Sequence, residues 1–320
     1  MSSATAAGGA SQGPSARAQE EGSIALRTGV RLHYVARGEG PLLILLHGFP
    51  EHWYAWRHVL GPLAAEGYRV VAPDMRGYNT SDKPRAVEDY YAETLGDDVA
   101  ALIEALGAER AIVVGHDWGG AAAWLLAMRH PERVERLVVM NMPHPAVFAE
   151  AWGTLRQRLR SAYFYFFRMR SLAAFVFRRM NALPQRLMLW WFSGRAPRWR
   201  DLEPYARAAL QPGAMKAMMS YYTALLDREP EALLAFVRPI DLPVRVLWGT
   251  EDPAFGEALA DPGPYVDRGQ LAIVKLPGLG HFLHLHDPPR VLQALREALT
   301  SPADPTLLRA GLESRGRIRR

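Results

Sequence analysis

The chain has 320 residues, of which 49% are hydrophobic and 22% charged, and it contains no cysteine. This composition predicts a soluble globular protein with a full core, and it excludes disulfides, cysteine–metal sites and thiol nucleophiles. No segment contains the ~18 uncharged apolar residues that a membrane span needs. Residues 1–22 are rich in Ser, Ala, Gly and Gln and lack a signal-peptide pattern, which predicts a disordered extension and a cytoplasmic protein.

Strand-like and helix-like segments alternate through the first half of the chain. Residues 24–34 alternate loosely between apolar and polar, whereas the run at 42–46 is continuously apolar and predicts burial on both faces. Strands are predicted at 24–34, 42–46, 68–72, 111–115 and 136–140, and helices at 56–66, 97–106 and 120–129. This alternation predicts an α/β fold with a mostly parallel, doubly wound sheet.

The pattern changes after residue 143. Up to residue 235 no strand-like run occurs, and the segments are helical and rich in aromatic residues and arginine. Strands are then predicted at 244–248 and 271–276, and a closing helix at 289–299. A helical insertion between two strands of one sheet predicts a lid. We therefore expect a core at 23–143 and 236–300, a helical lid at 144–235 and a basic C-terminal tail at 301–320.

Residues 115–120 have the sequence Gly-His-Asp-Trp-Gly-Gly and lie between a predicted strand and a predicted helix. Small residues around a central nucleophile in this setting are typical of a nucleophile elbow, where the chain turns too sharply for larger side chains. The central residue is Asp117, which is ionised near neutral pH and can attack an electrophilic carbon without a base. Resolving the resulting ester requires an activated water, so a neutral histidine and an orienting acid are expected downstream.

Four segments give the chain a resemblance to the epoxide hydrolases of the α/β-hydrolase fold. They are His-Gly-Phe-Pro at 47–50, the sequence at 74–84, the elbow at 115–120 and Gly-His at 280–281. In this order and at these separations the four segments are specific for that family. The resemblance covers about residues 24–299 and implies an α/β-hydrolase fold with an inserted helical lid. It also implies that an epoxide is converted to a vicinal diol through a covalent alkyl ester on Asp117.

The resemblance also implies the acid and the base of a catalytic triad. The acid follows the strand at 244–248, where Asp252 fits better than Glu251, and the histidine is His281, in the hydrolase order of nucleophile, acid and histidine. Some relatives place the acid after the preceding strand. Asn141 occupies that position here and cannot serve as an acid.

The strand end at 47–50 lies beside the elbow in such a fold. A backbone N–H near Phe49 can therefore pair with that of Trp118 to form an oxyanion hole. The resemblance further implies a cis peptide bond at Pro50.

An opened epoxide leaves as an alkoxide, and a tyrosine hydroxyl is suited to donate a proton to it because its pKa lies well above 7. The family places one such tyrosine in each of two lid helices. Tyr163 and Tyr222 align best, although aromatic residues in a lid are also common in its core. The residues expected to bind the substrate are His47, Pro50, Tyr165 and Tyr221.

Haloalkane dehalogenase is the nearest alternative, because it shares the aspartate nucleophile and the tryptophan after it. It needs a second halide-binding donor, and Phe49 is apolar where an asparagine often supplies one. Fluoroacetate-type dehalogenases carry arginines where this chain has Trp118 and two alanines. An ordinary esterase is excluded by the lack of Ser or Cys at 117. A catalytically silent ligand-binding protein would tolerate the loss of Asp252 or His281, and both are present.

No cofactor and no metal are expected. The spacing of His281, His284 and His286 could suit a metal, but no carboxylate or cysteine ligand stands in this run. His284 and His286 are therefore expected to face the lid or the surface. The expected partner is a small apolar epoxide, and a homo-oligomer is compatible with the sequence.

The net charge of +5 is unevenly placed. Residues 151–200 contain eleven arginines and no Asp or Glu. No nucleic-acid-binding module accompanies this charge, so nucleic acid is not an expected partner. One interpretation is a surface that meets an apolar molecule with an anionic end, either a fatty-acid epoxide or an anionic membrane. The other is that arginine stems pack on lid aromatics while their charged heads stay solvated.

Overall fold

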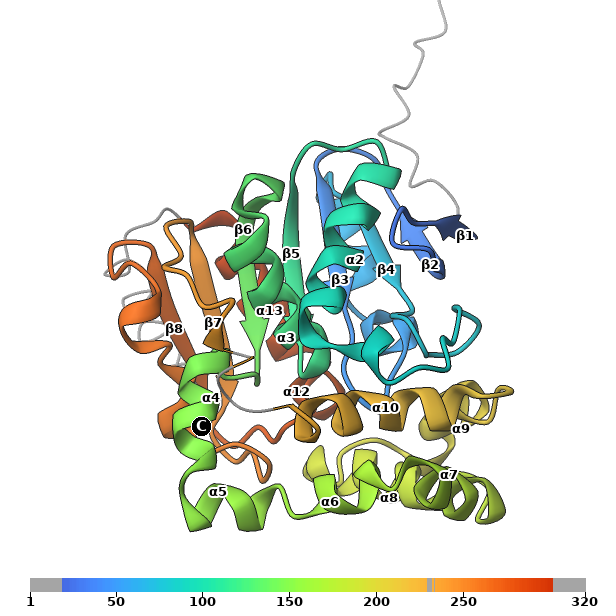
Figure 1. The fold of residues 1–320 in the computed structure, drawn as a ribbon. Helices are drawn as coiled ribbons and strands as arrows, with labels where there is room; N and C mark the ends of the chain where they lie inside the picture. Colours follow the sequence, from blue (N-terminus) through green and yellow to red (C-terminus); the bar gives the residue numbers. More distant parts are fainter. Residues whose placement is uncertain (1–18, 229–231, 233, 302–320) are drawn as a thin grey trace, which may run out of the picture.

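An eight-stranded sheet forms the centre of the molecule (Figure 1). The structure is a computed structural model that describes residues 19–228, 232 and 234–301. The strands are β1 (Glu20–Ala25), β2 (Arg31–Arg37), β3 (Leu42–Leu46), β4 (Arg69–Pro73), β5 (Ala111–His116), β6 (Val134–Met140), β7 (Val244–Gly249) and β8 (Leu271–Leu276). Their order is β1-β2-β4-β3-β5-β6-β7-β8, in which β2 is antiparallel to both neighbours and all other pairs are parallel. The expected α/β fold with a mostly parallel sheet is confirmed.

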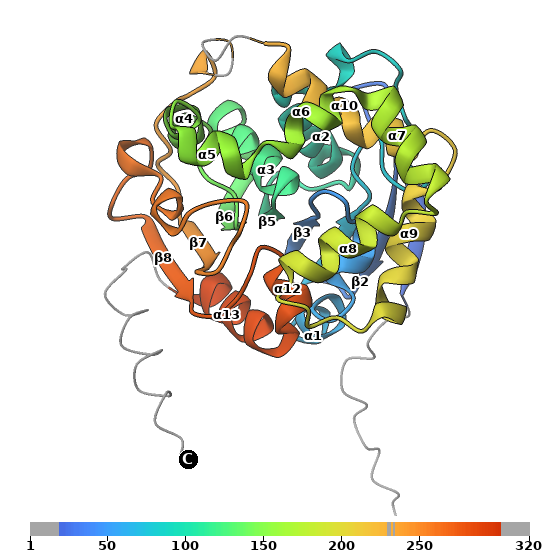
Figure 2. The same ribbon diagram turned by 90° about the horizontal axis from the view of Figure 1, so that it is seen from below.

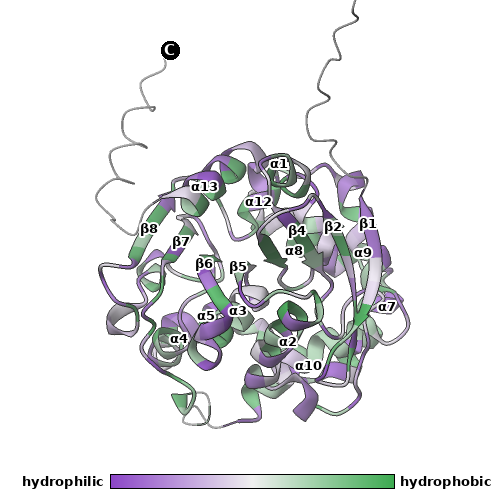
Figure 3. Cartoon of the chain, turned by 90° about the horizontal axis from the view of Figure 1, so that it is seen from above, coloured by the Kyte–Doolittle hydropathy of each residue, from purple (hydrophilic) through white to green (hydrophobic). Residues whose placement is uncertain are grey.

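Helices cover both faces of the sheet (Figure 3). Helices α1 (Leu60–Ala65) and α13 (Pro288–Thr300) lie on one face, and α2 (Ala92–Ala105) and α3 (Trp118–Arg129) lie on the other. Successive residues of a strand point to opposite faces, so β3 contributes Leu43 to the core beneath α13 and Ile44 to the core beneath α3. Because both of its faces are buried, β3 is apolar at every position.

A helical segment is inserted between β6 and β7, and it contains no strand among its described residues. We call residues 145–226 the inserted segment. Its helices are α4 (Pro145–Trp152), α5 (Leu155–Arg160), α6 (Tyr163–Arg168), α7 (Arg170–Arg179), α8 (Leu183–Phe192), α9 (Glu203–Ala209) and α10 (Ala214–Leu226). Figure 1 shows it below the sheet, on the side toward which the parallel strands point. The inserted segment therefore faces the edge where the carboxyl ends of those strands meet.

The first predicted strand is wrong, because residues 24–34 form a hairpin of β1 and β2. The chain reverses at Gly29, whose φ of 84° lies in the left-handed region that glycine adopts without steric cost. Since β1 already begins at Glu20, the predicted disordered extension at 1–22 is too long. Residues 1–18 and the predicted tail beyond residue 301 lie outside the described residues.

Two predicted helices also have different bounds. The helix predicted at 56–66 is a short 3-10 helix at Trp53–Trp56 followed by α1, which begins at Leu60. The helix predicted at 97–106 begins at Ala92, directly after the extended residue Tyr91. Its apolar face continues through Leu95, which is buried. None of the helices in the described ranges is long and apolar enough to cross a membrane.

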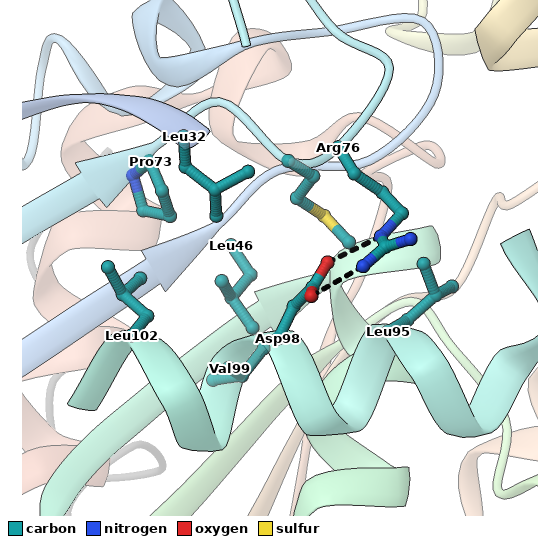
Figure 4. Close-up of a pocket in the computed structure, with 9 residues that line it drawn as sticks. Leu32, Leu46, Pro73, Arg76, Leu95, Asp98, Val99 and Leu102 are labelled. Atoms are coloured by element: carbon teal, nitrogen blue, oxygen red, sulfur yellow. Dashed lines mark hydrogen bonds and ion pairs between the residues drawn. The ribbon is translucent and has the colours of Figure 1, made fainter. Parts of the chain in front are cut away.

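A buried ion pair ties the loop after β4 to α2 (Figure 4). Arg76 donates to Asp98 from Nε at 2.5 Å and from Nη2 at 2.6 Å, and from Nη1 to the carbonyl of Asp89 at 2.6 Å. Thr28 donates its hydroxyl to the same carboxylate at 2.6 Å. Arg76 and Asp98 border a small cavity of about 10 Å³ whose other lining side chains are apolar. The pair fixes the start of the 74–84 segment relative to the sheet.

Candidate active site

Asp117 lies between β5 and α3 with φ 50° and ψ −123°, an unusual conformation for a residue with a side chain. The glycines beside it make the turn sterically feasible. A Cβ on Gly115 would lie 2.3 Å from the carbonyl oxygen of Gly119, and one on Gly119 would lie 2.4 Å from that of Leu46. The expected sharp turn, with Asp117 at its tip, is present. It directs the carboxylate to the carboxyl edge of the sheet.

The two oxygens of Asp117 face different groups. Oδ1 accepts a hydrogen bond from the backbone N–H of Phe49 at 2.7 Å, and Oδ2 lies 3.4 Å from Nε2 of His281. The peptide bond between Phe49 and Pro50 is cis, as expected. Trp118 is the first residue of α3, so its N–H has no acceptor within the helix. Of the two N–H groups expected to form an oxyanion hole, that of Phe49 contacts the Asp117 carboxylate, and that of Trp118 follows Asp117 directly in the chain.

Asp252 holds His281 from the other side of the imidazole. Its Oδ2 accepts from Nδ1 of His281 at 2.8 Å, and its Oδ1 accepts from the backbone N–H groups of Ala254 and Phe255 at 2.7 and 3.0 Å. A carboxylate held by several donors fixes both its own orientation and the ring it bonds. Asp117, His281 and Asp252 therefore lie in one line, joined by an ion-pair contact at 3.4 Å and a hydrogen bond at 2.8 Å, and all three are buried.

The protonation state of His281 depends on the two carboxylates beside its ring. Burial lowers its pKa, but the charge of Asp252 and the contacts with Asp117 and Asp252 outweigh burial and raise the pKa to about 10. The two carboxylates therefore favour the cationic imidazole in the resting protein, whereas the neutral histidine was expected for the later step that activates water. The ring lies between these two carboxylates.

Asn141 has a role that sequence reasoning missed. It follows β6, and its Nδ2 donates to Oδ2 of Asp252 at 2.6 Å while its Oδ1 accepts from the N–H of Gly249 at 2.8 Å. It adopts φ 43°, in the left-handed region that asparagine tolerates. Asn141 cannot be the acid, as expected, but it orients the acid. The available signal was its position at the end of the strand that pairs with β7.

Tyr163 and Tyr222 come together from α6 and α10, with ring centroids 6.3 Å apart. The ring of Tyr222 lies 5.1 Å from that of Phe49 and 5.4 Å from that of Trp118, which places it over the elbow. Burial, followed by the charges of Asp117 and Asp252, raises the pKa of Tyr163 well above 10. Burial, followed by Tyr163 and Asp117, does the same for Tyr222.

Both phenols are therefore protonated and lie within the field of the Asp117 carboxylate. In the described part of the chain, no carbonyl or carboxylate accepts a hydrogen bond from either hydroxyl. Both remain available to donate to a ligand.

The four residues expected to bind substrate are placed differently from one another. Tyr165 is exposed and packs on Trp152, away from the triad. Tyr221 is buried, and its hydroxyl donates to the carbonyl of Arg76 at 2.8 Å. The structure therefore does not bring these two hydroxyls to the triad.

The other two residues expected to bind substrate belong to the loop after β3. His47 is buried, with Nδ1 against the carbonyl of Gly48 at 2.9 Å and Nε2 accepting from the N–H of Met75 at 3.0 Å. Both of its nitrogens are thus engaged by the backbone. The carbonyl of Pro50 accepts from Nε2 of Gln185 at 2.8 Å, which links this loop to α8.

Glu51, His116 and His284 form a buried cluster behind the triad. Glu51 accepts from His284 Nε2 at 2.8 Å and contacts His116 Nδ1 at 3.1 Å, while His116 Nε2 lies 2.9 Å from the carbonyl of His281. One ligand-type atom from each of the three lies within 4.8 Å of the others, a set that could hold a metal ion by ligand type. Hydrogen bonds within the protein already engage these atoms.

The expectation that His284 faces the lid or the surface is wrong, because it points inward to Glu51 and is buried. His286 does face the inserted segment, where a Cβ on Gly194 would lie 2.5 Å from its ring.

Comparison with known proteins agrees with this fold and site. Residues 41–288 match the family described as the alpha/beta hydrolase fold, and the chain belongs to that family. It is 38% identical over 279 residues to the AB hydrolase superfamily protein YfhM of Bacillus subtilis, covering 85% of this chain and 95% of that protein. It is 36% identical over 279 residues to epoxide hydrolase 4 of Mus musculus, covering 84% of this chain and 76% of that protein.

Solved structures give the same result. A mutant of an epoxide hydrolase from Bacillus megaterium, crystallised with its diol product, has a TM-score of 0.79 and 29% identity. The match covers 88% of this chain and 100% of that one. The resemblance to epoxide hydrolases of the α/β-hydrolase fold is therefore confirmed.

Proposed function

We propose that this protein hydrolyses apolar epoxides to vicinal diols through a covalent ester on Asp117. The observation that carries the proposal is the surroundings of the Asp117 carboxylate. One oxygen is held by the N–H of Phe49 at 2.7 Å and the other faces the His281–Asp252 pair, while two phenols lie nearby. The relatives named epoxide hydrolases support the same assignment.

In the first half-reaction Asp117 attacks an epoxide carbon. Since the N–H of Phe49 holds Oδ1, the attacking atom is Oδ2, and Oδ1 becomes the carbonyl oxygen of the ester without moving. The carbon–oxygen bond of the ring breaks, and the alkoxide takes a proton from Tyr163 or Tyr222. Their raised pKa values keep both phenols protonated until a strong base such as an alkoxide forms beside them.

Ester formation removes the negative charge of Asp117, which is one of the two charges that raise the pKa of His281. The imidazole therefore becomes less basic at this step, and its proton returns to the phenol that gave one up. The neutral ring, held at Nδ1 by Asp252, then accepts a proton from water at Nε2. The imidazole of His281 is thus cationic before the ester forms and neutral when it activates water.

In the second half-reaction the activated water attacks Cγ of Asp117. The negative charge develops on Oδ1, which already lies at the N–H of Phe49, and the N–H of Trp118 is the second donor of the oxyanion hole. The bond between the ester oxygen and Cγ breaks, and His281 protonates the diol oxygen. Asp117 is then a carboxylic acid that carries the second proton of the water. This proton passes to the neutral His281, which restores the carboxylate and the cationic imidazole.

The two phenols favour an epoxide over a haloalkane as the substrate. A halide leaves without needing a proton, whereas an alkoxide is strongly basic and is stabilised by an O–H donor. Phe49 places an apolar ring where a second halide donor is often found, and it packs on Tyr222. Because the phenols come from α6 and α10, we infer that the inserted segment acts as the lid of this site.

The test is to incubate the protein with aryl and alkyl epoxides beside haloalkanes of matched size and to measure diol and halide separately. We expect diol from epoxides, no halide, and loss of activity in Asp117→Asn. Tyr163→Phe combined with Tyr222→Phe should reduce ester formation, since no O–H remains for the alkoxide. Halide release without diol would establish the dehalogenase alternative, and no turnover of either class would indicate a binding protein.

A further inference from the structure

The helices of the inserted segment are apolar on both sides, which is unusual for helices on the surface of a monomer. In α7 the inner face buries Ala173 and Phe177 against the rest of the protein. The outer face exposes Leu172 and Phe175, the latter 64% exposed. The inner face accounts for the folding of α7. The outer apolar residues have no such explanation.

Exposed apolar side chains are concentrated in this part of the chain. Of the eleven large hydrophobic residues that are exposed in the described chain, ten lie between residues 155 and 199. They are Leu155, Leu159, Tyr165, Met169, Leu172, Phe175, Met180, Leu187, Trp191 and Trp199. Helices α5, α6, α7 and α8, which carry most of them, line the lower edge of the molecule in Figure 1 and cross the face turned to the viewer in Figure 2. We call this surface the outer face. Concentrations of exposed apolar residues mark sites of interaction with a protein or a membrane.

Most of the outer face lies within residues 151–200, where the charged side chains have a single sign. Residues 151–200 contain eleven arginines and no acid. Some of these arginines pair with acids that follow later in the chain, such as Arg168 with Asp227. Arg156, Arg178 and Arg179 are exposed, and no described carboxylate forms an ion pair with them.

Aromatic residues accompany the arginines of the outer face. Arg195 lies over the ring of Trp191 at 4.3 Å, and Arg186 lies over that of Trp199 at 5.4 Å. These contacts place guanidinium groups of the arginines over aromatic rings. They leave Phe175 and Leu155 uncovered, at 64% and 72% exposed.

We propose that the outer face docks on an anionic lipid membrane. Apolar side chains that stand among cationic ones, on helices lying in one plane, are the pattern of an interfacial surface. Leucine and phenylalanine side chains enter the acyl boundary, arginine heads bind lipid phosphates, and tryptophan rings such as Trp191 lie at the interface between them. The charge is complementary to phosphatidylglycerol and similar headgroups.

A second copy of the chain fits the outer face less well. A two-fold dimer brings the same patch of each subunit together, so exposed Arg178 and Arg179 would meet like charges, and residues 151–200 contain no acid to pair with them. A purely apolar dimer interface would not explain the exposed arginines. An anionic membrane binds the apolar side chains through its acyl chains and the arginines through its phosphates.

The test is sedimentation of the full chain with vesicles of phosphatidylcholine alone and of phosphatidylcholine mixed with phosphatidylglycerol. We expect binding to the mixed vesicles and weaker binding to phosphatidylcholine. Raising salt from 0.1 to 1 M should reduce binding, because the screening length falls from about 10 to about 3 Å. Failure to bind the mixed vesicles would overturn the proposal.

Matched variants assign the binding to the outer face. Phe175→Ser should lower the partition coefficient into the mixed vesicles about tenfold. Leu234 is also an exposed large hydrophobic residue but lies outside the inserted segment, so Leu234→Ser should leave the coefficient unchanged. Arg178→Gln and Arg179→Gln should each weaken it about fivefold, whereas Arg31→Gln, in β2, should not. These residues are exposed, so unfolding curves should match the unmodified chain. Equal effects in test and control variants would overturn the proposal, as would a dimer that Phe175→Ser abolishes.

Discussion

Replacing Asp117 by asparagine should lower the pKa of His281. The substitution keeps the size of the side chain and removes one of the two negative charges beside the imidazole. At 3.4 Å and an effective dielectric constant of about 20, that charge interacts with the cationic ring by about 5 kcal/mol. One pKa unit corresponds to about 1.4 kcal/mol, and the amide oxygen retains part of the attraction, so we expect a fall of about 3 units. The pKa of about 10 in the unmodified protein should thus move to about 7.

The assay is an NMR titration of isotope-labelled histidine, with the His281 signal assigned by its absence in His281→Gln. Asp97→Asn is the matched control, because it removes a carboxylate from beside another histidine, His130, at 2.7 Å. It should leave His281 unchanged. A His281 pKa that stays near 10 in Asp117→Asn would refute the idea that the nucleophile's charge holds the imidazole protonated.

Stability should change with pH for the same reason. A raised folded-state pKa stabilises the folded protein fully below the unfolded value of about 6.5, and that contribution is lost as the pH rises through about 10. The free energy of unfolding of the unmodified protein should therefore fall across this window. In Asp117→Asn the His281 contribution should be lost at a lower pH, which urea unfolding at several pH values will detect.

Three further predictions concern single residues. His281→Gln should still form the ester but not release it, so mass spectrometry should find a stable adduct on the Asp117 peptide, and normal turnover would contradict the role of His281. Asn141→Ala removes a 2.6 Å hydrogen bond to Asp252, and it should lower kcat about tenfold with little change in KM. Steady-state rates equal to those of the unmodified protein would argue against a positioning role for Asn141. Asp98→Asn breaks the buried pair with Arg76 and should destabilise the fold by about 3 kcal/mol in urea unfolding. Asp97→Asn, which breaks a partly exposed pair with Arg129, should cost less than about 1 kcal/mol, and equal losses would contradict the importance of burial.

The features that could be predicted from the sequence depend on neighbouring residues. The run at 42–46 matches β3, because a strand buried on both faces is apolar at every position. The run at 271–276 matches β8, an edge strand that is apolar except for the exposed Lys275. The elbow could be recognised because Gly115 and Gly119 are needed within the same turn as Asp117. The hairpin of β1 and β2 was missed because its strands lie at a sheet edge and are partly polar.

The features that could not be predicted depend on distant segments meeting. Glu51 and His284 are 233 positions apart, so nothing in the local spacing of the histidines indicates that His284 faces a buried carboxylate. Asn141 reaches Asp252 because β6 and β7 pair across the inserted segment. Tyr163 and Tyr165 are two positions apart on α6, which turns them to opposite sides of the helix, and only the packed structure distinguishes the inner from the exposed side.

The covalent role of Asp117 is tested most directly by a single turnover of an epoxide in water enriched in heavy oxygen. The account predicts that the first diol is unlabelled, because its new oxygen comes from Oδ2 of Asp117, and that heavy oxygen appears in the Asp117 carboxylate. Heavy oxygen in the first diol would mean that water attacks the epoxide itself, and it would contradict the assignment of Asp117 as the nucleophile.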